Sequence, residues 1–265
     1  MSRVSDTFER LRGEKRKALV IFLTAGDPGL RATVDLAKAA SGAGADIIEL
    51  GVPFSDPLAD GPVIQESFHR AIKRGANLKK TLAAAAQMRK TNQTPLVFML
   101  ASTLVIHHGV RRFMRDCSAA GVDGVILPDV PCEEAGEFIP HARASKLDTI
   151  MLAAPTSPAR RLRKIVSLSR GFVYYINVRG VTGKQTASPK DAAGGIARLK
   201  KMTRLPVVAG FGVTRPEQAR ELSRNADGIV IGSQAIRVIR DAKNASAAAR
   251  DLARFVRSIR KGLDG

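Results

Sequence analysis

Short apolar runs alternate with amphipathic helical patterns along the chain, and this alternation restricts the fold more than any other feature. The runs are rich in β-branched residues and almost continuously apolar, which is typical of strands buried on both faces. Helical patterns between strands predict parallel strands with right-handed crossovers. The predicted strands are residues 19–23, 46–50, 96–100, 124–127, 149–152, 172–176, 207–209 and 228–231.

The number of repeats selects among parallel folds. Eight strands favour a closed (β/α)₈ TIM barrel over an open doubly wound sheet, and 265 residues is close to the usual length of about 250 for such a barrel. An additional N-terminal helix is predicted before the first strand, and another helix over residues 247–260. No linker or low-complexity tract interrupts the pattern, so residues 1–265 are predicted to form a single domain. The predicted helices between these ends are residues 30–41, 65–74, 78–90, 109–120, 133–145, 160–169, 192–201 and 216–223.

The charge balance of the chain is unusual. Lys and Arg number 43 against 24 Asp and Glu, a formal net charge of +19. Such an excess raises the question of nucleic-acid binding. However, the basic residues are scattered, no basic tail is present, and only 5% of residues are aromatic. We therefore favour solvated helix faces over a nucleic-acid site, and the charge remains able to steer anionic substrates toward the protein.

Cysteine usage and hydropathy indicate the compartment. Cys117 and Cys132 are the two cysteines, and they lack the spacing of a metal site. No run approaches about 18 uninterrupted apolar residues, and the polar N-terminal stretch has no signal-peptide core. We expect a cytoplasmic protein that does not enter a membrane.

Two connections after strands are unusually elaborate, over residues 51–62 and 177–189. In a (β/α)₈ barrel the loops at the C-terminal ends of the strands carry the active site. Long loops in compact domains are usually functional. Both segments are therefore predicted to lie on the catalytic face.

Glu49 interrupts an otherwise apolar strand near its C-terminal end. A glutamate in that position should point into the mouth of the barrel, where partial desolvation would raise its pKa and suit it to proton transfer. A structural glutamate paired with an Arg or a backbone donor fits the same position equally well. The strand alone does not decide between these roles.

The loop after Glu49 contains two more acids, Asp56 and Asp60, among prolines and glycines. Proline fixes φ and glycine permits unusual backbone angles, so this loop has a defined shape and can hold an acid at a fixed distance from Glu49. Asp beside Pro or Gly is also a common turn residue. We interpret Asp56 as a turn residue and Asp60 as a catalytic residue.

Three glycine motifs point to a phosphate site. GVTG over residues 180–183 follows the sixth strand, GFG over 210–212 follows the seventh, and GS over 232–233 follows the eighth at the start of a helix. Glycine lets backbone approach a phosphate, and a helix N-terminus offers free N–H groups. Each motif alone is weak evidence, but phosphate sites recur in these loops of TIM barrels.

Metal-dependent and Schiff-base aldolase chemistry are not supported by the sequence. His69, His107, His108 and His141 lack ligand spacing and are interpreted as helix-surface residues, so no metal is expected. Lys17 and Lys184 do not lie at strand ends where a Schiff base would form. Carbon–carbon cleavage on this barrel would have to use acid–base chemistry.

Taken together, these segments resemble the tryptophan synthase alpha chain family, and the similarity covers nearly the whole chain. The matching motifs are LTAGDPG at 23–29, ADIIELGVPFSDPLADGPVIQ at 45–65, GVDGVILPDVPCEE at 121–134, GVTG, and GFGV followed by IGS. The segment 45–65 is the most specific of them. The resemblance implies a lyase of tryptophan biosynthesis that cleaves indole-3-glycerol phosphate into indole and glyceraldehyde 3-phosphate.

The resemblance also implies roles for individual residues. Glu49 matches the position that shuttles a proton to the indole ring carbon, and Asp60 matches the position that stabilises positive charge at the indole nitrogen. The remaining matches are substrate-binding positions, with Gly183, Gly212, Gly232 and Ser233 on the glycerol phosphate and Phe22, Ile126, Tyr174 and Thr182 in the pocket.

The family implies a partner as well. Its members pair with a beta chain, usually as two alpha and two beta chains, which receives indole through a tunnel and carries the pyridoxal phosphate. No cofactor is then expected in this chain. Ala101 and Thr103 stand where the family usually has Tyr and Asn, in a loop that contributes to the pocket and the partner surface. A stand-alone indole-releasing lyase and a weakly catalytic binding or regulatory subunit therefore remain as alternatives.

Overall fold

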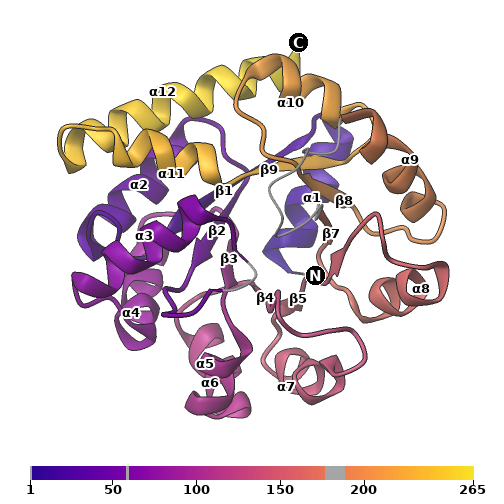
Figure 1. Ribbon diagram of the computed structural model, residues 1–265, viewed down its shortest axis with the longest axis horizontal. Helices are drawn as coiled ribbons and strands as arrows, with labels where there is room; N and C mark the ends of the chain where they lie inside the picture. Colours follow the sequence, from indigo (N-terminus) through magenta and orange to yellow (C-terminus); the bar gives the residue numbers. More distant parts are fainter. Residues whose placement is uncertain (1, 58–59, 177–188) are drawn as a thin grey trace.

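Parallel strands form the inner layer of the computed structural model, which describes residues 2–57, 60–176 and 189–265 (Figure 1). All strand pairs are parallel, as the sequence predicts, and the order is β5-β4-β3-β2-β1-β9-β8-β7-β6. The strands are β1 (Ala18–Thr24), β2 (Ile47–Gly51), β3 (Leu96–Met99), β4 (Gly124–Ile126), β5 (Asp148–Thr149), β6 (Leu152–Ala153), β7 (Val173–Ile176), β8 (Val207–Gly210) and β9 (Gly228–Ile231).

The sheet closes through the fifth predicted strand, which is split into β5 and β6. The first piece pairs with β4 and the second with β7. Between them, Ile150 N donates to Val125 O at 3.0 Å, and Tyr174 N donates to Met151 O at 3.1 Å. Both edges of the sheet therefore meet in one short stretch of chain. The (β/α)₈ barrel is confirmed, with its fifth strand divided.

Helices surround this barrel on all sides (Figure 1). The prediction missed α5, a seven-residue helix with the β-branched residues Thr103, Val105 and Ile106, which lower helix propensity. The helix expected over 133–145 is shorter, because Gly136 and Pro140 interrupt it. The helices are α1 (Arg3–Gly13), α2 (Leu30–Gly42), α3 (Pro62–Lys73), α4 (Leu78–Arg89), α5 (Ser102–His108), α6 (Val110–Ala119), η1 (Ala135–Glu137), α7 (Ile139–Ala144), α8 (Ala159–Leu168), α9 (Pro189–Lys200), α10 (Pro216–Ser223), α11 (Ser233–Arg240) and α12 (Ala245–Asp264).

The two-residue period of the strands separates two apolar layers. In β1, Val20 and Phe22 belong to the cluster inside the barrel, whereas Leu19 and Ile21 belong to the layer under the helices. Successive strand residues point to opposite faces. In β2 the same alternation places Ile47 inside and Ile48 outside, so Glu49 points into the barrel.

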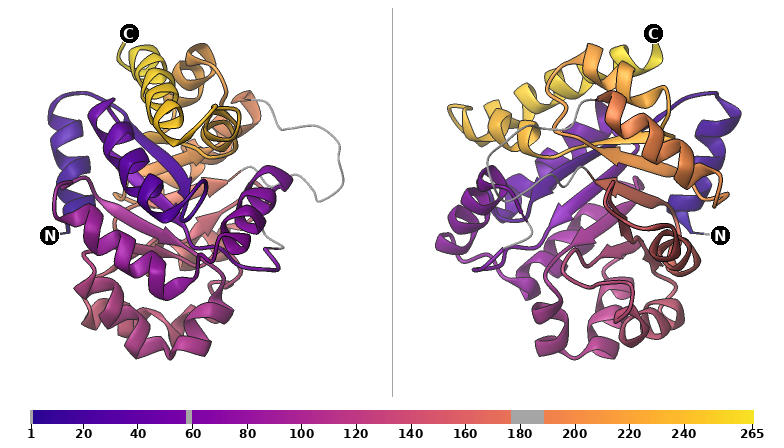
Figure 2. Two further views of the ribbon diagram at one scale, coloured as in Figure 1. Left: turned by 90° about the vertical axis from the view of Figure 1, so that its left-hand side faces the viewer. Right: turned by 45° about the vertical axis from the view of Figure 1, so that its right-hand side comes forward.

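The additional N-terminal helix, α1, covers the end of the barrel where the strands begin. Its buried residues Val4, Phe8 and Leu11 join the inner cluster, and the ring of Phe8 lies 5.7 Å from that of Phe172. Figure 2 shows α1 and α3 at opposite ends of the barrel. The end that α1 covers is therefore the one opposite the C-terminal ends of the strands.

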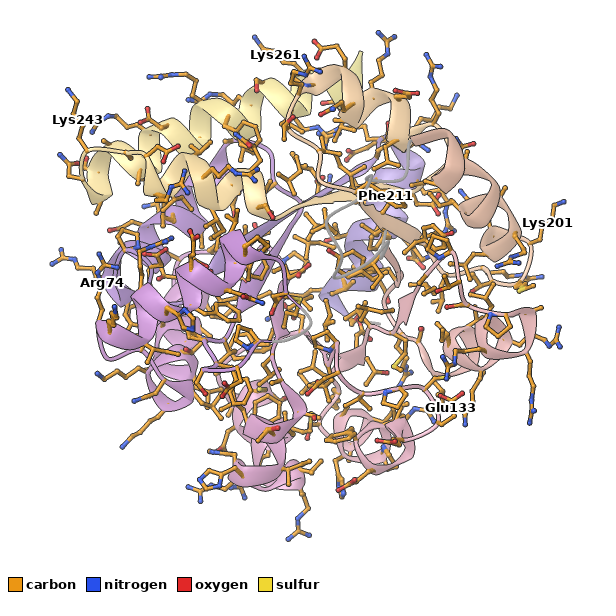
Figure 3. The ribbon with its side chains drawn as sticks, viewed as in Figure 1. Arg74, Glu133, Lys201, Phe211, Lys243 and Lys261 are labelled. Carbon is orange, nitrogen blue, oxygen red and sulfur yellow. The ribbon has the colours of Figure 1, made fainter. Side chains whose placement is uncertain are left out.

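Most of the excess positive charge lies on the outer helices. Arg74, Lys201, Lys243 and Lys261 point away from the barrel into solvent (Figure 3). This placement agrees with the interpretation of solvated helix faces. Among the residues that the structure describes, no helix is long and apolar enough to span a bilayer.

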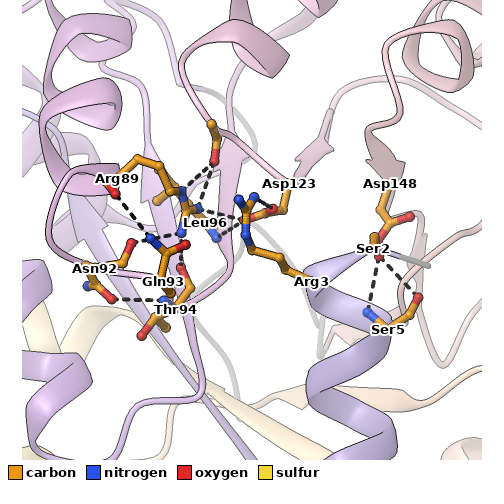
Figure 4. Close-up of polar contacts among 11 residues, drawn as sticks. Ser2, Arg3, Ser5, Arg89, Asn92, Gln93, Thr94, Leu96, Asp123 and Asp148 are labelled. Atoms are coloured by element: carbon orange, nitrogen blue, oxygen red, sulfur yellow. Dashed lines mark hydrogen bonds and ion pairs between the residues drawn. The ribbon is translucent and has the colours of Figure 1, made fainter.

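Buried aspartates at the covered end of the barrel are paired. Asp123 precedes β4, is 6% exposed, and accepts hydrogen bonds from Leu96 N, Arg3 Nη1 and Arg89 Nη2, each at 2.8 Å (Figure 4). Asp46 precedes β2 and accepts from Leu19 N at 2.9 Å and from Arg260 Nη1 at 3.0 Å. Each carboxylate thus joins neighbouring strands to a surrounding helix.

Candidate active site

Glu49 lies inside the barrel, in register with Phe22 of β1 and Val97 of β3. Its side chain is 1% exposed, and Oε2 has no hydrogen-bond partner among the described residues. Burial raises the pKa of Glu49 to about 8, and the nearby Asp60 carboxylate contributes to the rise. At pH 7 this carboxyl group is mostly protonated and can act as a proton donor.

A cavity of about 230 Å³ opens at the C-terminal ends of β2, β3 and β4. Met99, which is in register with Gly51 two residues beyond Glu49, lines this cavity. Its walls are mainly apolar, with Asp56, Asp60 and Asp129 as the acids. The complete lining is Phe54, Asp56, Pro57, Asp60, Phe68, Met99, Leu100, Ala101, Thr103, Pro128 and Asp129. Such a cavity suits a flat apolar ring with one polar edge.

The loop that carries Asp60 is held by α3. Gln65 Nε2 donates to the carbonyl oxygens of Asp60 at 2.9 Å and Pro57 at 3.2 Å. Ser67 Oγ, on the same helix, lies 2.6 Å from Thr24 Oγ1 at the end of β1. The helix is thus fixed to the barrel and holds the loop in turn, as the prediction of a shaped loop requires.

The Asp60 carboxyl lies in a negatively charged environment. Burial raises its pKa to about 6, and the charge of Asp129 contributes. At pH 7 Asp60 is therefore mostly ionised while Glu49 is mostly protonated. Two carboxyl groups whose environments separate their pKa values in this way are suited to opposite acid and base roles.

Asp56 behaves differently from Asp60. Its Oδ2 accepts a hydrogen bond from Ser55 Oγ at 2.7 Å in an exposed position. This local contact agrees with the turn role that the sequence suggested for Asp56.

Aromatic residues surround the acids inside the barrel. The ring of Phe22 occupies the space above Gly51, where an added Cβ would lie 2.5 Å from Phe22 Cζ. Tyr174 packs over Gly210 in the same manner, with 2.7 Å between an added Cβ and Tyr174 Cε2. Burial, then the charges of Glu49 and Asp60, raise the pKa of Tyr174, so it remains a neutral hydrogen-bond donor close to both acids. Ile126, at the end of β4, is fully buried in the same inner cluster.

The predicted phosphate residues lie at the same end of the barrel as the acids. Gly212 follows β8 with φ of +62°, a left-handed conformation that favours glycine. Gly232 precedes α11, with Phe22 Cβ and Ile64 Cδ1 each 3.7 Å from the position of an added Cβ. Ser233 is the first residue of α11, where backbone N–H groups lack intrahelical partners. Thr182 and Gly183 lie outside the described residues.

Two residues at the site were not singled out from the sequence. Gln65 is the last residue of the most specific motif. Nothing in the sequence indicates that a glutamine on a helix donates hydrogen bonds to the carbonyl groups of the preceding loop. Asp129 could have been predicted from the sequence, because the segment LPDVP places an acid beside prolines directly after a strand, as in the loop of Asp60. The same argument that selected Asp60 would have selected Asp129.

The other candidate groups in the described part of the chain do not line the cavity, although His69 Nε2 lies 3.3 Å from Ser55 O, between the lining residues Phe54 and Asp56. Lys184 lies outside the described residues. His69, His107, His108 and His141 are on α3, α5 and α7, and His108 Nε2 lies 2.8 Å from Asp116 Oδ2. Lys17 Nζ donates to Ala226 O at 2.8 Å near the start of β1. In the described part of the chain, His, Cys, Asp and Glu form no cluster of three that could hold a metal ion.

Comparisons with known proteins agree with this geometry. The family model described as "Tryptophan synthase alpha chain" matches residues 8–263. The tryptophan synthase alpha chain of Geobacter sulfurreducens is 44% identical over 263 residues, covering 99% of each chain. That of Geotalea daltonii is 47% identical over 237 residues, covering 89% of this chain and 90% of the relative.

A solved structure shows the same architecture. The tryptophan synthase alpha chain from Legionella pneumophila subsp. pneumophila superimposes with a TM-score of 0.91 at 32% identity. The match covers 100% of this chain and 98% of the Legionella chain.

Proposed function

The chain belongs to the tryptophan synthase alpha chain family and is a lyase of tryptophan biosynthesis that cleaves indole-3-glycerol phosphate, and we propose that Glu49 and Asp60 catalyse this cleavage. The observation that carries the proposal is the buried Glu49 carboxyl, which has an oxygen without a partner among the described residues and lies close to Asp60, an acid that lines the apolar cavity. Acid–base chemistry of this kind needs one protonated and one ionised group near neutral pH.

Glu49 acts as the proton donor. The bond between ring carbon 3 of the indole and the carbinol carbon breaks only after carbon 3 is protonated, because an indole carbanion is a poor leaving group. Glu49 gives its proton to carbon 3, and the ring nitrogen becomes positively charged. The carbinol hydroxyl then returns a proton to Glu49 as the carbon–carbon bond breaks. The electron pair of that bond restores the aromatic ring, which gives indole and glyceraldehyde 3-phosphate.

Asp60 acts as the carboxylate that faces the ring nitrogen. Its ionised form accepts a hydrogen bond from the indole N–H, and that bond strengthens as positive charge develops in the transition state. The neighbouring cavity is lined by Phe54, Phe68, Met99 and Leu100, which suit the apolar faces of the indole ring. Phe22, Ile126 and Tyr174, which pack in or against the inner cluster of the barrel, are the proposed pocket residues on the barrel side of the ring.

The glycerol phosphate would bind at the loops after β7, β8 and β9. Gly212, Gly232 and Ser233, with Thr182 and Gly183, provide the proposed contacts. The support is the left-handed Gly212 and the free N–H groups at the start of α11. The positive potential of the whole chain assists the approach of this dianion.

A beta chain is the proposed partner, in a complex of two alpha and two beta chains in the cytoplasm. Pyridoxal phosphate would belong to that partner, and no cofactor is assigned to this chain. The exposed Ile106 on α5, 54% accessible beside the altered strand-3 loop, supports a covered surface there. A lyase that works alone is the second candidate, because Ala101 and Thr103 replace larger or more polar residues in that loop.

The test is an assay of the purified protein with indole-3-glycerol phosphate, measuring indole and glyceraldehyde 3-phosphate together. We expect both products in equal amounts, and a bell-shaped dependence of kcat/KM on pH with limbs near 6 and 8. Addition of a beta chain should raise the rate; an unchanged rate would favour the lyase that works alone. No indole release in either condition would refute the proposed function and favour a binding subunit.

A further inference from the structure

Asp129 joins two loops of the catalytic face. It lies in the loop after β4, and its Oδ1 and Oδ2 accept hydrogen bonds from Ser102 N at 3.0 and 2.9 Å. Oδ2 also accepts from Ser102 Oγ at 2.9 Å. Ser102 is the first residue of α5, whose preceding residue, Ala101, has no side chain that could cap the helix. Asp129 therefore caps α5 from a different loop.

The same carboxylate lines the cavity. Asp60, Ala101 and Asp129 come from the loops after β2, β3 and β4, and all three border the space assigned to the indole ring. The contacts of Asp129 with Ser102 fix the start of α5 and therefore the position of Ala101. One side chain thus shapes the wall of the cavity and also places a negative charge near Asp60.

Building on the cleavage proposed above, we propose that Asp129 is a positioning residue for this reaction: it holds the cavity wall at Ala101 and Ser102, and its charge faces Asp60. It does not exchange protons with the substrate. Its effect reaches the reacting ring through Asp60 and through the shape of the pocket.

The electrostatic consequence concerns how strongly Asp60 binds the indole N–H. After burial, the charge of Asp129 is the cause that raises the pKa of Asp60 to about 6. A more basic carboxylate is a stronger hydrogen-bond acceptor, so it interacts more strongly as the ring nitrogen becomes cationic. Among the residues that the structure describes, the charged and titratable groups around Asp60 are Glu49 of β2, Tyr174 of β7, Asp56 of its own loop and Asp129.

Asp129→Asn is the informative variant, because it removes the charge and keeps the size. The acid limb of kcat/KM should move to lower pH, since Asp60 no longer faces the charge of Asp129. On the plateau, kcat should fall about tenfold as Asp60 becomes a weaker acceptor. KM should rise by less than that, because Asn keeps one acceptor oxygen for Ser102.

Two control variants separate charge from shape. Ser102→Ala removes one of the hydrogen bonds and leaves the charge of Asp129, so KM should rise up to about threefold while the acid limb stays in place. Glu133→Gln removes an equal charge further along the same loop, where the exposed side chain pairs with Arg161 at 3.3 Å. It should leave the acid limb and kcat unchanged. A Glu133→Gln variant that moves the limb as far as Asp129→Asn would refute the specific role of Asp129.

A readout without substrate distinguishes failure of this proposal from failure of the proposed function. The carboxyl carbon of Asp60 is titrated by ¹³C NMR in the wild type and in Asp129→Asn, with the amide spectrum as the check of folding. We expect a lower Asp60 pKa in the variant. An unchanged pKa overturns the inference even if the enzyme cleaves its substrate, whereas absence of cleavage by the wild type refutes the function and leaves this titration valid.

Discussion

Buried carboxyl groups have different hydrogen-bond partners at the two ends of the barrel. At the end covered by α1, Asp123 accepts hydrogen bonds from one backbone N–H and two arginines. At the open end, Glu49 is more deeply buried, at 1% exposed, and one of its oxygens has no partner among the described residues. Both acids lie within one barrel, only a few residues from a strand end. The difference between them lies in their partners.

This contrast separates stability from function. A buried charge with paired donors holds strands and helices together, whereas a buried acid without donors keeps its proton and destabilises the fold once it ionises. The pKa of Glu49 is about 8 in the folded chain and 4.5 as its ordinary value. Since the folded state holds the proton more tightly, stability falls as pH rises from about 4.5 to about 8. The proposed chemistry needs this unfavourable arrangement at Glu49.

The largest expected effect is the loss of catalysis on Glu49→Gln. Gln has the shape of protonated Glu and cannot give up a proton, so kcat should fall about 10³-fold or more. Indole release measured at pH 7 tests this, with Glu133→Gln as the matched exposed control. Residual activity within tenfold of the wild type would remove Glu49 from the catalytic role.

The matched change at the other end, Asp123→Asn, should act on stability. It leaves Arg3 and Arg89 without their charge partner, and the expected loss is about 3 kcal/mol in the free energy of unfolding. Urea denaturation at pH 7 measures this loss, and kcat of the folded fraction should stay within twofold of the wild type. A large fall in kcat with no loss of stability would contradict the division between the two ends.

Glu49→Gln should also stabilise the protein, which is the opposite sign to Asp123→Asn. At pH 8 the variant should gain about 4 kcal/mol, because an amide avoids the cost of a buried acid whose pKa is raised from 4.5 to about 8. The gain should disappear below about pH 4.5, where Glu49 is protonated in both the folded and the unfolded state. Urea denaturation of the wild type and the variant from about pH 3.5 to 8.5 measures it. A gain that does not depend on pH would indicate a packing effect instead.

A smaller effect is expected at Gln65. Gln65→Glu replaces the amide donor with a carboxylate, so the carbonyls of Pro57 and Asp60 lose their hydrogen bonds and Asp60 is held less precisely. We expect kcat to fall about tenfold with a nearly unchanged stability. Steady-state kinetics and a thermal melt measure both quantities. Gln65→Met, which keeps the length but cannot donate, should give the same fall without the added charge.

The barrel was predictable because its signal is periodic and repeated. The alternation of apolar strands, such as residues 19–23, with amphipathic helices is repeated along the chain. An error in one strand or helix boundary therefore does not change the predicted fold. The prediction was wrong locally, where one or two residues determine whether a helix or strand continues. Gly136 and Pro140 break a helix that the apolar pattern continues, and pairing with different neighbours divides the fifth strand into β5 and β6.

The site was predictable in part. Glu49 and Asp60 were selected because an acid in an apolar strand and an acid in a Pro- and Gly-rich loop are both out of place. Contacts such as Ser102 with Asp129 join residues 27 apart, and no local pattern predicts them. The paired acids at the covered end follow a sequence pattern of their own. Asp46, Asp123 and Asp227 each stand at the start of a strand, after a helix and a short turn.

The direct test of this account is the titration of the Glu49 side chain itself. In protein labelled with ¹³C at glutamate, the carboxyl resonance that disappears in Glu49→Gln is followed from pH 4 to 10. We expect a midpoint near 8, which keeps the proton in place for transfer at neutral pH. A midpoint at or below 4.5 would mean that Glu49 is a solvated or paired carboxylate at pH 7 and cannot be the acid of the reaction.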